Sequence, residues 1–147
     1  MTAKEYLSQA YVVDQHIKRM IRQARSLRDL TENTSQVLSD MPHSPSRSTT
    51  QLEDVIIRIA DLDDKIIASE NRLVLLKKEL GNAISQVDNQ TYELLLNLRY
   101  LCFMPWPEIA PILGYDLRYT YKLHIKALQK VDSQGHYKTL ETQKKIL

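Results

Sequence analysis

The chain has 147 residues, which fits one or two small domains, and its 20 Lys and Arg against 18 Asp and Glu give a net charge of +2. That charge is too small to identify a nucleic-acid-binding protein, so such a function must rest on how the charges are distributed. Three glycines, five prolines and the absence of strand-like alternation leave little room for sheets and predict an all-α fold.

Two long segments carry apolar residues at alternating steps of three and four, the spacing of helices that wrap around a partner helix. The first runs from Ala3 to Leu38 and contains neither glycine nor proline. The second runs from Leu52 to Val87, where Gly81 alone weakens it, by about 1 kcal/mol relative to alanine. Both segments are therefore predicted to be helices of a coiled coil.

The segment 41–50, MPHSPSRSTT, is predicted to be a loop because it combines two prolines with several hydroxyl residues. Thr50 and Glu53 are placed for a capping box at the start of the second helix. A short loop between two long helices favours an antiparallel arrangement. Residues 1–87 are therefore predicted to form an antiparallel helical (coiled-coil) hairpin, an arm for oligomerisation or interaction.

Charged blocks on the two helices support this pairing. The first helix carries a basic block and the second an acidic one: Lys18, Arg19, Arg22, Arg25 and Arg28, and Asp61, Asp63, Asp64 and Glu70. Folding the chain near residue 46 places residue 28 near residue 64, so the blocks partly face each other. The basic block could instead be a second DNA-binding patch, but pairing across the hairpin is the favoured interpretation.

Residues 88–131 are predicted to form a three-helix head. Its first helix starts at 89 or 90 and ends at Cys102, with leucines along one side. Its second helix begins near Trp106, which we expect to anchor the core of the head. Pro111 should shorten or kink that helix, because a proline one turn inside a helix removes a backbone hydrogen bond.

A tight turn follows this second helix. Gly114 can take the left-handed conformation that ends a helix, and Asp116 stands where an N-cap belongs. The third helix, 117–131, then carries a stripe of residues with buried-side spacing: Thr120, Leu123, Ala127, Leu128 and Val131. This is the layout of a helix-turn-helix, whose second helix can lie in the major groove of DNA.

The outward side of the third helix is basic. Its cations recur every four residues and follow one flank, because each such step turns about 40° around the helix axis. Phosphates attract Lys and Arg, and an arginine can bind a guanine edge with two hydrogen bonds. The predicted DNA-binding residues are Leu117, Arg118, Tyr119, Tyr121, Lys122, Lys126 and Lys130. The alternative is that these cations only form a solvated face. The turn, the N-cap and the apolar stripe favour DNA binding over this alternative.

The head resembles region 4 of the bacterial sigma-70 family over the segment LLLNLRYLCFMPWPEIAPILGYDLRYTYKLHIKAL, residues 94–128. That family has an LRYL helix, a linker, an aromatic-x-E-I-A-x-x-L-G helix and a recognition helix ending in A-L. Nearly the whole chain is similar to small phage and prophage regulators of Gram-positive bacteria that carry such a head. These include an uncharacterised streptococcal-type family, which begins with MTAKEYL or similar, and the autolysin-regulator and late-gene-activator groups.

The resemblance implies a phage-derived transcription regulator that binds promoter DNA, with RNA polymerase as a candidate second partner. By this resemblance, the residues that fall where the recognition helix of the family meets DNA are Asp116, Leu117, Arg118, Tyr119, Tyr121 and Lys122. The chain departs from the family pattern at Asp116, where Ser is usual, and at Leu117, where a polar or basic residue is usual. It also has Pro107 and Pro111 where acidic or polar residues are more usual. The change at Leu117 removes one expected polar contact with DNA.

No pattern in the chain indicates an enzyme, a cofactor or a metal site. The four histidines, of which His124 is expected to pack or to contact a phosphate, lack metal-ligand spacing. The single cysteine, Cys102, is expected to be a small core residue in a reducing cytoplasm. The polar start and the lack of an apolar run of ~20 residues predict neither a signal peptide nor a membrane span. We therefore expect the protein in the cytoplasm of a bacterial host, associated with the nucleoid.

The sequence thus predicts a sequence-specific regulator that binds double-stranded DNA. Its arm is expected to form a dimer or tetramer, because DNA readers of this class often pair to match two half-sites; burial of the arm against the head or against a foreign protein is the alternative. Two other functions stay open: a small terminase-like packaging or assembly protein, and a polymerase-binding adaptor without DNA affinity. Residues 132–147 are predicted to be a polar tail, either a loose helix or disordered.

Overall fold

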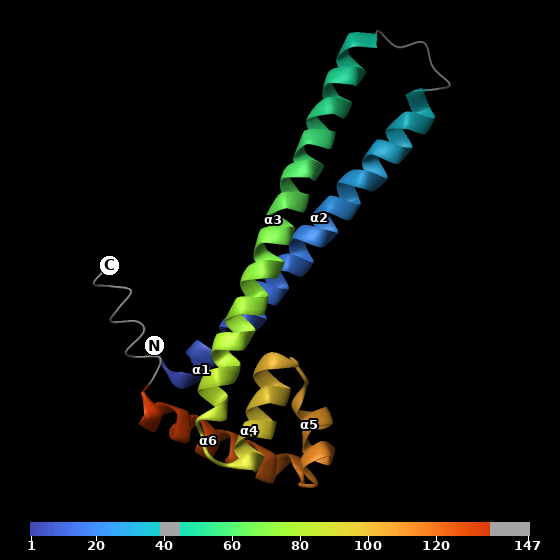
Figure 1. Cartoon of the computed structure of the whole chain (residues 1–147). Helices are drawn as coiled ribbons and strands as arrows, with labels where there is room; N and C mark the ends of the chain where they lie inside the picture. Colours follow the sequence, from blue (N-terminus) through green and yellow to red (C-terminus); the bar gives the residue numbers. More distant parts are fainter. Residues whose placement is uncertain (39–44, 136–147) are drawn as a thin grey trace, which may run out of the picture. The chain divides into compact units, whose positions relative to one another are not determined.

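The computed structural model of the chain describes residues 1–38 and 45–135. All regular elements in these two stretches are helices, so the expected all-α class is confirmed. Within them, no helix combines the length and the hydrophobicity that crossing a membrane requires. In chain order the elements are α1 (Ala3–Leu7), α2 (Gln9–Leu38), α3 (Pro45–Ser85), α4 (Gln90–Leu96), the π-helix η1 (Asn97–Leu101), α5 (Trp106–Leu113) and α6 (Leu117–Gln134) (Figure 1).

The chain divides into two compact units. Unit 1 comprises Met1–Val12 and Leu73–Leu147, and unit 2 comprises Val13–Arg72. This differs from the predicted division at residue 87, because both ends of the predicted arm supply side chains to the same hydrophobic core as α4 and α6. The buried residues from these two ends are Ala3, Tyr6, Leu7, Ala10, Leu80, Ile84 and Val87.

The first helix of the chain starts with a capping box. Thr2 Oγ1 accepts a hydrogen bond from Glu5 N at 3.2 Å, and Glu5 Oε2 accepts one from Thr2 N at 3.0 Å. The predicted continuous helix 3–38 is interrupted at Ser8, whose hydroxyl donates to the carbonyl of Lys4 at 2.6 Å. Such bonding of a serine to the carbonyl four residues back commonly bends helices, which accounts for the break between α1 and α2.

The core of unit 1 joins helices from distant parts of the chain. Leu95 and Leu96 of α4 are fully buried, as is Ala127 of α6. They pack in one cluster with the α1 and α3 side chains, and Trp106 and Leu128 lie partly buried at its edge. Trp106 therefore lies at the border of the core. The sequence predicted instead that Trp106 would anchor the core of the head. Burial of apolar area in this cluster is the main stabilising contribution to unit 1.

The predicted helix from 89 or 90 to Cys102 is present as two elements of different geometry. Asn89 Oδ1 accepts a hydrogen bond from Tyr92 N at 3.1 Å and so caps α4. From Asn97 the helix widens, and Cys102 N donates to the carbonyl of Asn97, five residues back, at 3.0 Å. Widening shifts the residues that follow around the helix axis: Tyr100 is buried and Cys102 is exposed. The predicted core position of Cys102 is therefore wrong.

Unit 2 consists of the remaining parts of α2 and α3, which run antiparallel (Figure 1). Arg28 Nη2 lies 2.5 Å from Asp63 Oδ2, in agreement with the register obtained by folding the chain near residue 46. On α2 the buried side chains of this unit are Ile17, Met20 and Ala24. The facing seam of α3 is only half-buried, at Leu52, Val55, Ile59, Leu62 and Ile66. Two helices thus cover each other's apolar sides incompletely, as expected for a pair without a third layer.

The connection between α2 and α3 is shorter than the predicted loop 41–50. Residues 45–50 are helical, and Pro45 is the first residue of α3. Proline suits the first helical position because its fixed φ matches the helix and its missing N–H would have no partner there. Thr50 therefore lies inside the helix, and the predicted capping box with Glu53 is wrong. The part of the loop before Pro45 lies outside the described residues.

We predict that Leu80→Ala destabilises the protein by about 2–5 kcal/mol, because Leu80 is fully buried in the core of unit 1 and its truncation leaves a cavity. The matched control is Leu75→Ala on the same helix, where the leucine is 69% exposed and the change should stay within about 0.5 kcal/mol. Urea unfolding followed by circular dichroism measures both. Equal effects of the two changes would contradict the assignment of this part of α3 to the core.

Candidate nucleic-acid interface

The turn between α5 and α6 has the geometry that its glycine predicts. Gly114 takes the left-handed conformation, with φ of 77°. Gly114 N donates to the carbonyl of Pro111 and Tyr115 N to that of Ala110, each at 3.1 Å. These two bonds form a Schellman motif, which satisfies carbonyls at the end of α5. A Cβ at Gly114 would meet no atom within 4 Å, so conformational strain, not space, is what disfavours another residue here.

Asp116 caps the start of α6, as predicted. Its Oδ1 accepts a hydrogen bond from Tyr119 N at 2.7 Å, and its carbonyl accepts one from the Thr120 hydroxyl at 2.8 Å. The carboxylate also lies at the positive end of the helix dipole. Thr120 is fully buried, and this bond satisfies its hydroxyl. The cap and the buried threonine together fix where α6 begins and which side faces the core.

One side of α6 is buried and lies against α1, α4 and α5. Thr120, Leu123, Ala127 and Val131 form this side, with Leu128 half-buried beside them, which confirms the predicted stripe. The helix continues to Gln134, so the first residues of the predicted tail 132–147 are helical. The tail from residue 136 lies outside the described residues.

The opposite side of α6 is exposed and carries all seven predicted DNA-binding residues: Leu117, Arg118, Tyr119, Tyr121, Lys122, Lys126 and Lys130. At about 100° per residue, Arg118 and Lys122 lie near the middle of this face, and Lys126 and Lys130 move progressively to one flank. Within the described residues, none of these four cations forms an ion pair. The exposed face of α6 therefore carries four cations without a salt-bridge partner among the described residues, and Asp88 is an acidic residue that shares a groove with Lys126 and Lys130.

Aromatic contacts hold two of the exposed tyrosines. The ring of Tyr119 packs edge-on against Tyr115, with 4.8 Å between the ring centroids, and Tyr121 packs in the same way against Trp106 at 5.5 Å. Each ring keeps part of its surface exposed to solvent. Such contacts limit the rotamers of the tyrosines, so that less side-chain entropy is lost when they bind a partner.

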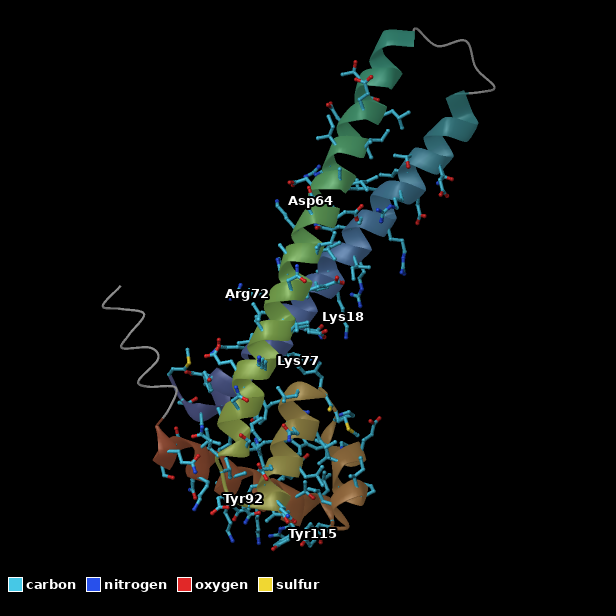
Figure 2. All side chains as sticks on the ribbon, viewed as in Figure 1. Lys18, Asp64, Arg72, Lys77, Tyr92 and Tyr115 are labelled. Atoms are coloured by element: carbon cyan, nitrogen blue, oxygen red, sulfur yellow. The ribbon has the colours of Figure 1, made fainter. Side chains whose placement is uncertain are left out.

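Two features of this face escaped the sequence analysis. Ile125, 57% exposed, lies near the middle of the exposed face between the rows of polar residues. Lys126 and Lys130 line a shallow groove together with Asp88, Asn89 and Tyr92 at the start of α4, where Figure 2 labels Tyr92. Ile125 could have been found by helical spacing alone. The groove could not, because it depends on how α4 packs against α6.

His124 belongs to the packing of the head. Its Nε2 lies 2.6 Å from the hydroxyl of Tyr100, and its ring centroid is 4.4 Å from that of Trp106. Burial lowers the pKa of His124 to about 4, with smaller contributions from the positive charges of Lys4 and Arg99. Burial likewise raises the pKa of Tyr100 to about 12. His124 is therefore neutral near pH 7, which favours the packing role over the alternative of a charged phosphate contact.

The described parts of the chain contain no group of three or more His, Cys, Asp or Glu side chains arranged to hold a metal ion. Cys102 is exposed at the end of η1. The seven predicted residues on the exposed face of α6 present cations, hydroxyl groups, aromatic rings and an apolar side chain. Such groups bind other molecules through ion pairs, hydrogen bonds and van der Waals contacts.

We predict that acid destabilises the protein through His124. The pKa of His124 in the folded state is about 4, below the ordinary value of 6.5, so the unfolded chain takes up a proton first as the pH falls. The stability that neutral His124 contributes is therefore fully present above pH 6.5 and is lost as the pH falls toward 4. His124→Gln should therefore show a weaker fall of the urea midpoint over this interval than the parent protein. Identical pH slopes for the two proteins would contradict a buried, neutral histidine.

Comparisons of the chain with models of protein families, with curated proteins and with solved structures found no match. The chemistry and geometry of the protein's own residues are therefore the basis for its function. The exposed face of α6 is the part of the head where exposed cations and aromatic residues lie together.

Proposed function

We propose that this protein is a sequence-specific transcription regulator that reads promoter DNA with α6. In this proposal an antiparallel helical hairpin, formed by α2 and α3, is combined with a C-terminal helix-turn-helix head like region 4 of the sigma-70 family. One observation carries the proposal: four cations lie along a single exposed helix face without an acidic partner among the described residues.

Affinity in this proposal comes from phosphates. Arg118 and Lys122 contact the backbone of the duplex near the middle of the exposed face, and Lys126 and Lys130 extend the contacts along one flank. Each phosphate that a Lys or Arg neutralises releases condensed counterions, and this release makes binding favourable and dependent on salt. Asn89 and Tyr92 line the same groove as Lys126 and are suited to hydrogen bonds with phosphate oxygens, whereas the carboxylate of Asp88 in this groove repels phosphate.

Base reading falls to the start of α6, because the N-terminal residues of a recognition helix contact base edges in the major groove. At its specific site Arg118, which has the planar fork that binds the O6 and N7 of guanine, contacts a base edge in place of the phosphate that it contacts on a random-sequence duplex. Leu117, and also Ile125, are exposed apolar side chains of a kind that meet thymine methyl groups. Tyr119 and Tyr121, each held by a neighbouring ring, contribute base or sugar contacts.

The biological setting that we propose rests on the sequence resemblance. The LRYL motif at 98–101 and the segment 106–128 are the parts of the chain most similar to phage and prophage regulators of Gram-positive bacteria. By this reasoning the protein acts in the cytoplasm of a bacterial host, associated with the nucleoid, with RNA polymerase as a further partner that the head contacts.

The arm is proposed to join copies of the chain into a dimer or tetramer. In unit 2 the α3 seam is only half-buried, and Ile56 and Ile67 are more than half exposed. These two isoleucines share one side of α3, because eleven residues make about three helical turns. A second hairpin would cover this side, and exposed arginines of the α2 basic block would then face acidic residues of the α3 block.

The same exposed apolar side of α3 favours a second candidate function, that of a terminase-like packaging or assembly protein, since such proteins also join DNA-binding heads through helices. The two functions differ in assembly size. A ring of eight or more subunits would indicate packaging, and a dimer or tetramer would indicate regulation. The remaining function, an adaptor that binds polymerase, differs from both because the protein would then show no binding to duplex DNA.

We predict that the double change Arg118→Ala and Lys122→Ala weakens binding to a random-sequence duplex about tenfold and lowers the slope of log affinity against log salt by about 2, because two phosphate contacts are lost. Fluorescence anisotropy at several salt concentrations measures both quantities. A random duplex suffices, since the phosphate contribution does not depend on sequence.

The matched control for this experiment is Lys18→Ala with Arg22→Ala, which removes one lysine and one arginine at the same spacing from exposed positions of α2 (Lys18 is labelled in Figure 2). The control should leave the salt slope unchanged. If the control lowers the slope and the α6 variant does not, the arm and not α6 is the DNA-binding surface.

We predict that Ile56→Glu with Ile67→Glu converts the protein to a monomer in analytical ultracentrifugation, because it places charges on the apolar side that we assign to self-association. Ala68→Glu adds the same charge to an exposed residue on another side of α3 and should leave the oligomer intact. An oligomer that survives the double change would place the interface elsewhere.

A further inference from the structure

A second candidate site lies in unit 1, apart from the exposed face of α6. It is a cavity of about 370 Å³ that α1, the start of α2, η1, α5 and α6 enclose together. Its volume falls in the range of small-molecule sites in proteins. Its walls include Lys4, Tyr11, Arg99, Phe103, Trp106 and His124.

Two cations line this cavity. They are Lys4 from α1 and Arg99 from η1, and among the described residues no carboxylate lines it. Arg99 is held in place by neutral groups: its Nη1 donates to the carbonyl of Met104 at 3.0 Å, and its guanidinium lies 4.8 Å from the centroid of the Trp106 ring. Because neither of these partners carries a negative charge, the charge of Arg99 is uncompensated. Both cations are close enough to His124 to lower its pKa.

Aromatic rings also line the cavity, and one of them, Phe103, carries the ammonium group of Lys77 at 4.7 Å from its centroid. The rings of Tyr11 and Phe103 meet edge to face with 5.7 Å between their centroids. Phe103 takes a left-handed backbone conformation, with φ of 58°, which is uncommon for a bulky residue and strains the backbone. Such strain is maintained only where the surrounding structure enforces it, and here it accompanies a ring that lines a cavity.

A polar and neutral pair of side chains also lines the cavity. The hydroxyl of Tyr100 and the imidazole of His124 are hydrogen-bonded to each other at 2.6 Å, and both groups stay uncharged near neutral pH. They therefore add no negative charge that would cancel the two cations. The lining of the cavity thus combines two cations, aromatic rings and a neutral hydrogen-bonded pair.

We propose that this cavity binds a small aromatic carboxylate, with the carboxylate between Lys4 and Arg99 and the ring against Tyr11 and Phe103. Arginine and lysine bind carboxylates by charge-assisted hydrogen bonds, and aromatic walls stabilise a ring by burial and by edge-to-face contacts. A small inorganic anion would leave the aromatic walls unused, and a neutral aromatic molecule would leave the cations without a partner. The site is separate from the proposed DNA-binding face and does not depend on that function.

The test uses Trp106, which lines the cavity and is the single tryptophan of the chain, so that its fluorescence reports on this site. The full-length protein is titrated with benzoate, and in parallel with acetate, inorganic phosphate and benzyl alcohol. We expect saturable binding of benzoate about tenfold tighter than that of acetate, phosphate or benzyl alcohol. No saturable change with benzoate, or binding of acetate or phosphate as tight as that of benzoate, overturns the proposal.

A pair of variants assigns the binding to the cavity. Lys4→Gln should weaken benzoate binding about tenfold, because it removes one charge-assisted hydrogen bond. Lys78→Gln replaces an exposed lysine of α3 that does not line the cavity and should leave the affinity unchanged. Equal affinities of the two variants for benzoate would overturn the assignment of the carboxylate to Lys4. Because benzoate binding is measured without DNA, its outcome is independent of whether α6 binds a duplex.

Discussion

Burial of one side of α6 is the constraint on which the rest of the head depends. Thr120, Leu123 and Ala127 lie in the core, and the hydroxyl of Thr120 is satisfied only because it bonds back to the carbonyl of Asp116. A helix with one side fixed in this way has no freedom to rotate about its axis. The cations are therefore held outward by the same packing that stabilises unit 1, and the proposed DNA contacts follow from the core.

The aromatic residues of the head connect this exposed face with the interior. Trp106 contacts Tyr121 on the exposed side of α6, His124 beside the core and Arg99 on η1. Burial, and to a smaller extent the charges of Lys4 and Arg99, keep His124 neutral, so that it adds no third positive charge beside these rings. One side chain, Trp106, thus borders the proposed DNA-binding face and the aromatic–cationic cavity.

Local signals made the turn, the cap and the exposed cations of α6 predictable, and non-local packing made the rest of the head difficult to predict. Gly114 and Asp116 each act through bonds to residues within five positions, so the turn, the cap and the outward row of cations could be read from spacing. The widening at η1 has no comparable local signal, and it moved Cys102 to the surface. The groove beside Lys130 and the cavity beside Lys4 depend on helices that are far apart in the sequence, and no periodicity reveals them.

The composition of the unit 1 core also has a consequence for how the protein is made. Leu7 is synthesised well before Ala127 and Val131, which share its cluster. Its side chain therefore stays without these partners until α6 has emerged from the ribosome, and contacts of such long sequence separation form slowly. The emergence of α6, and not that of the helices before it, then sets the moment at which the head acquires its interior.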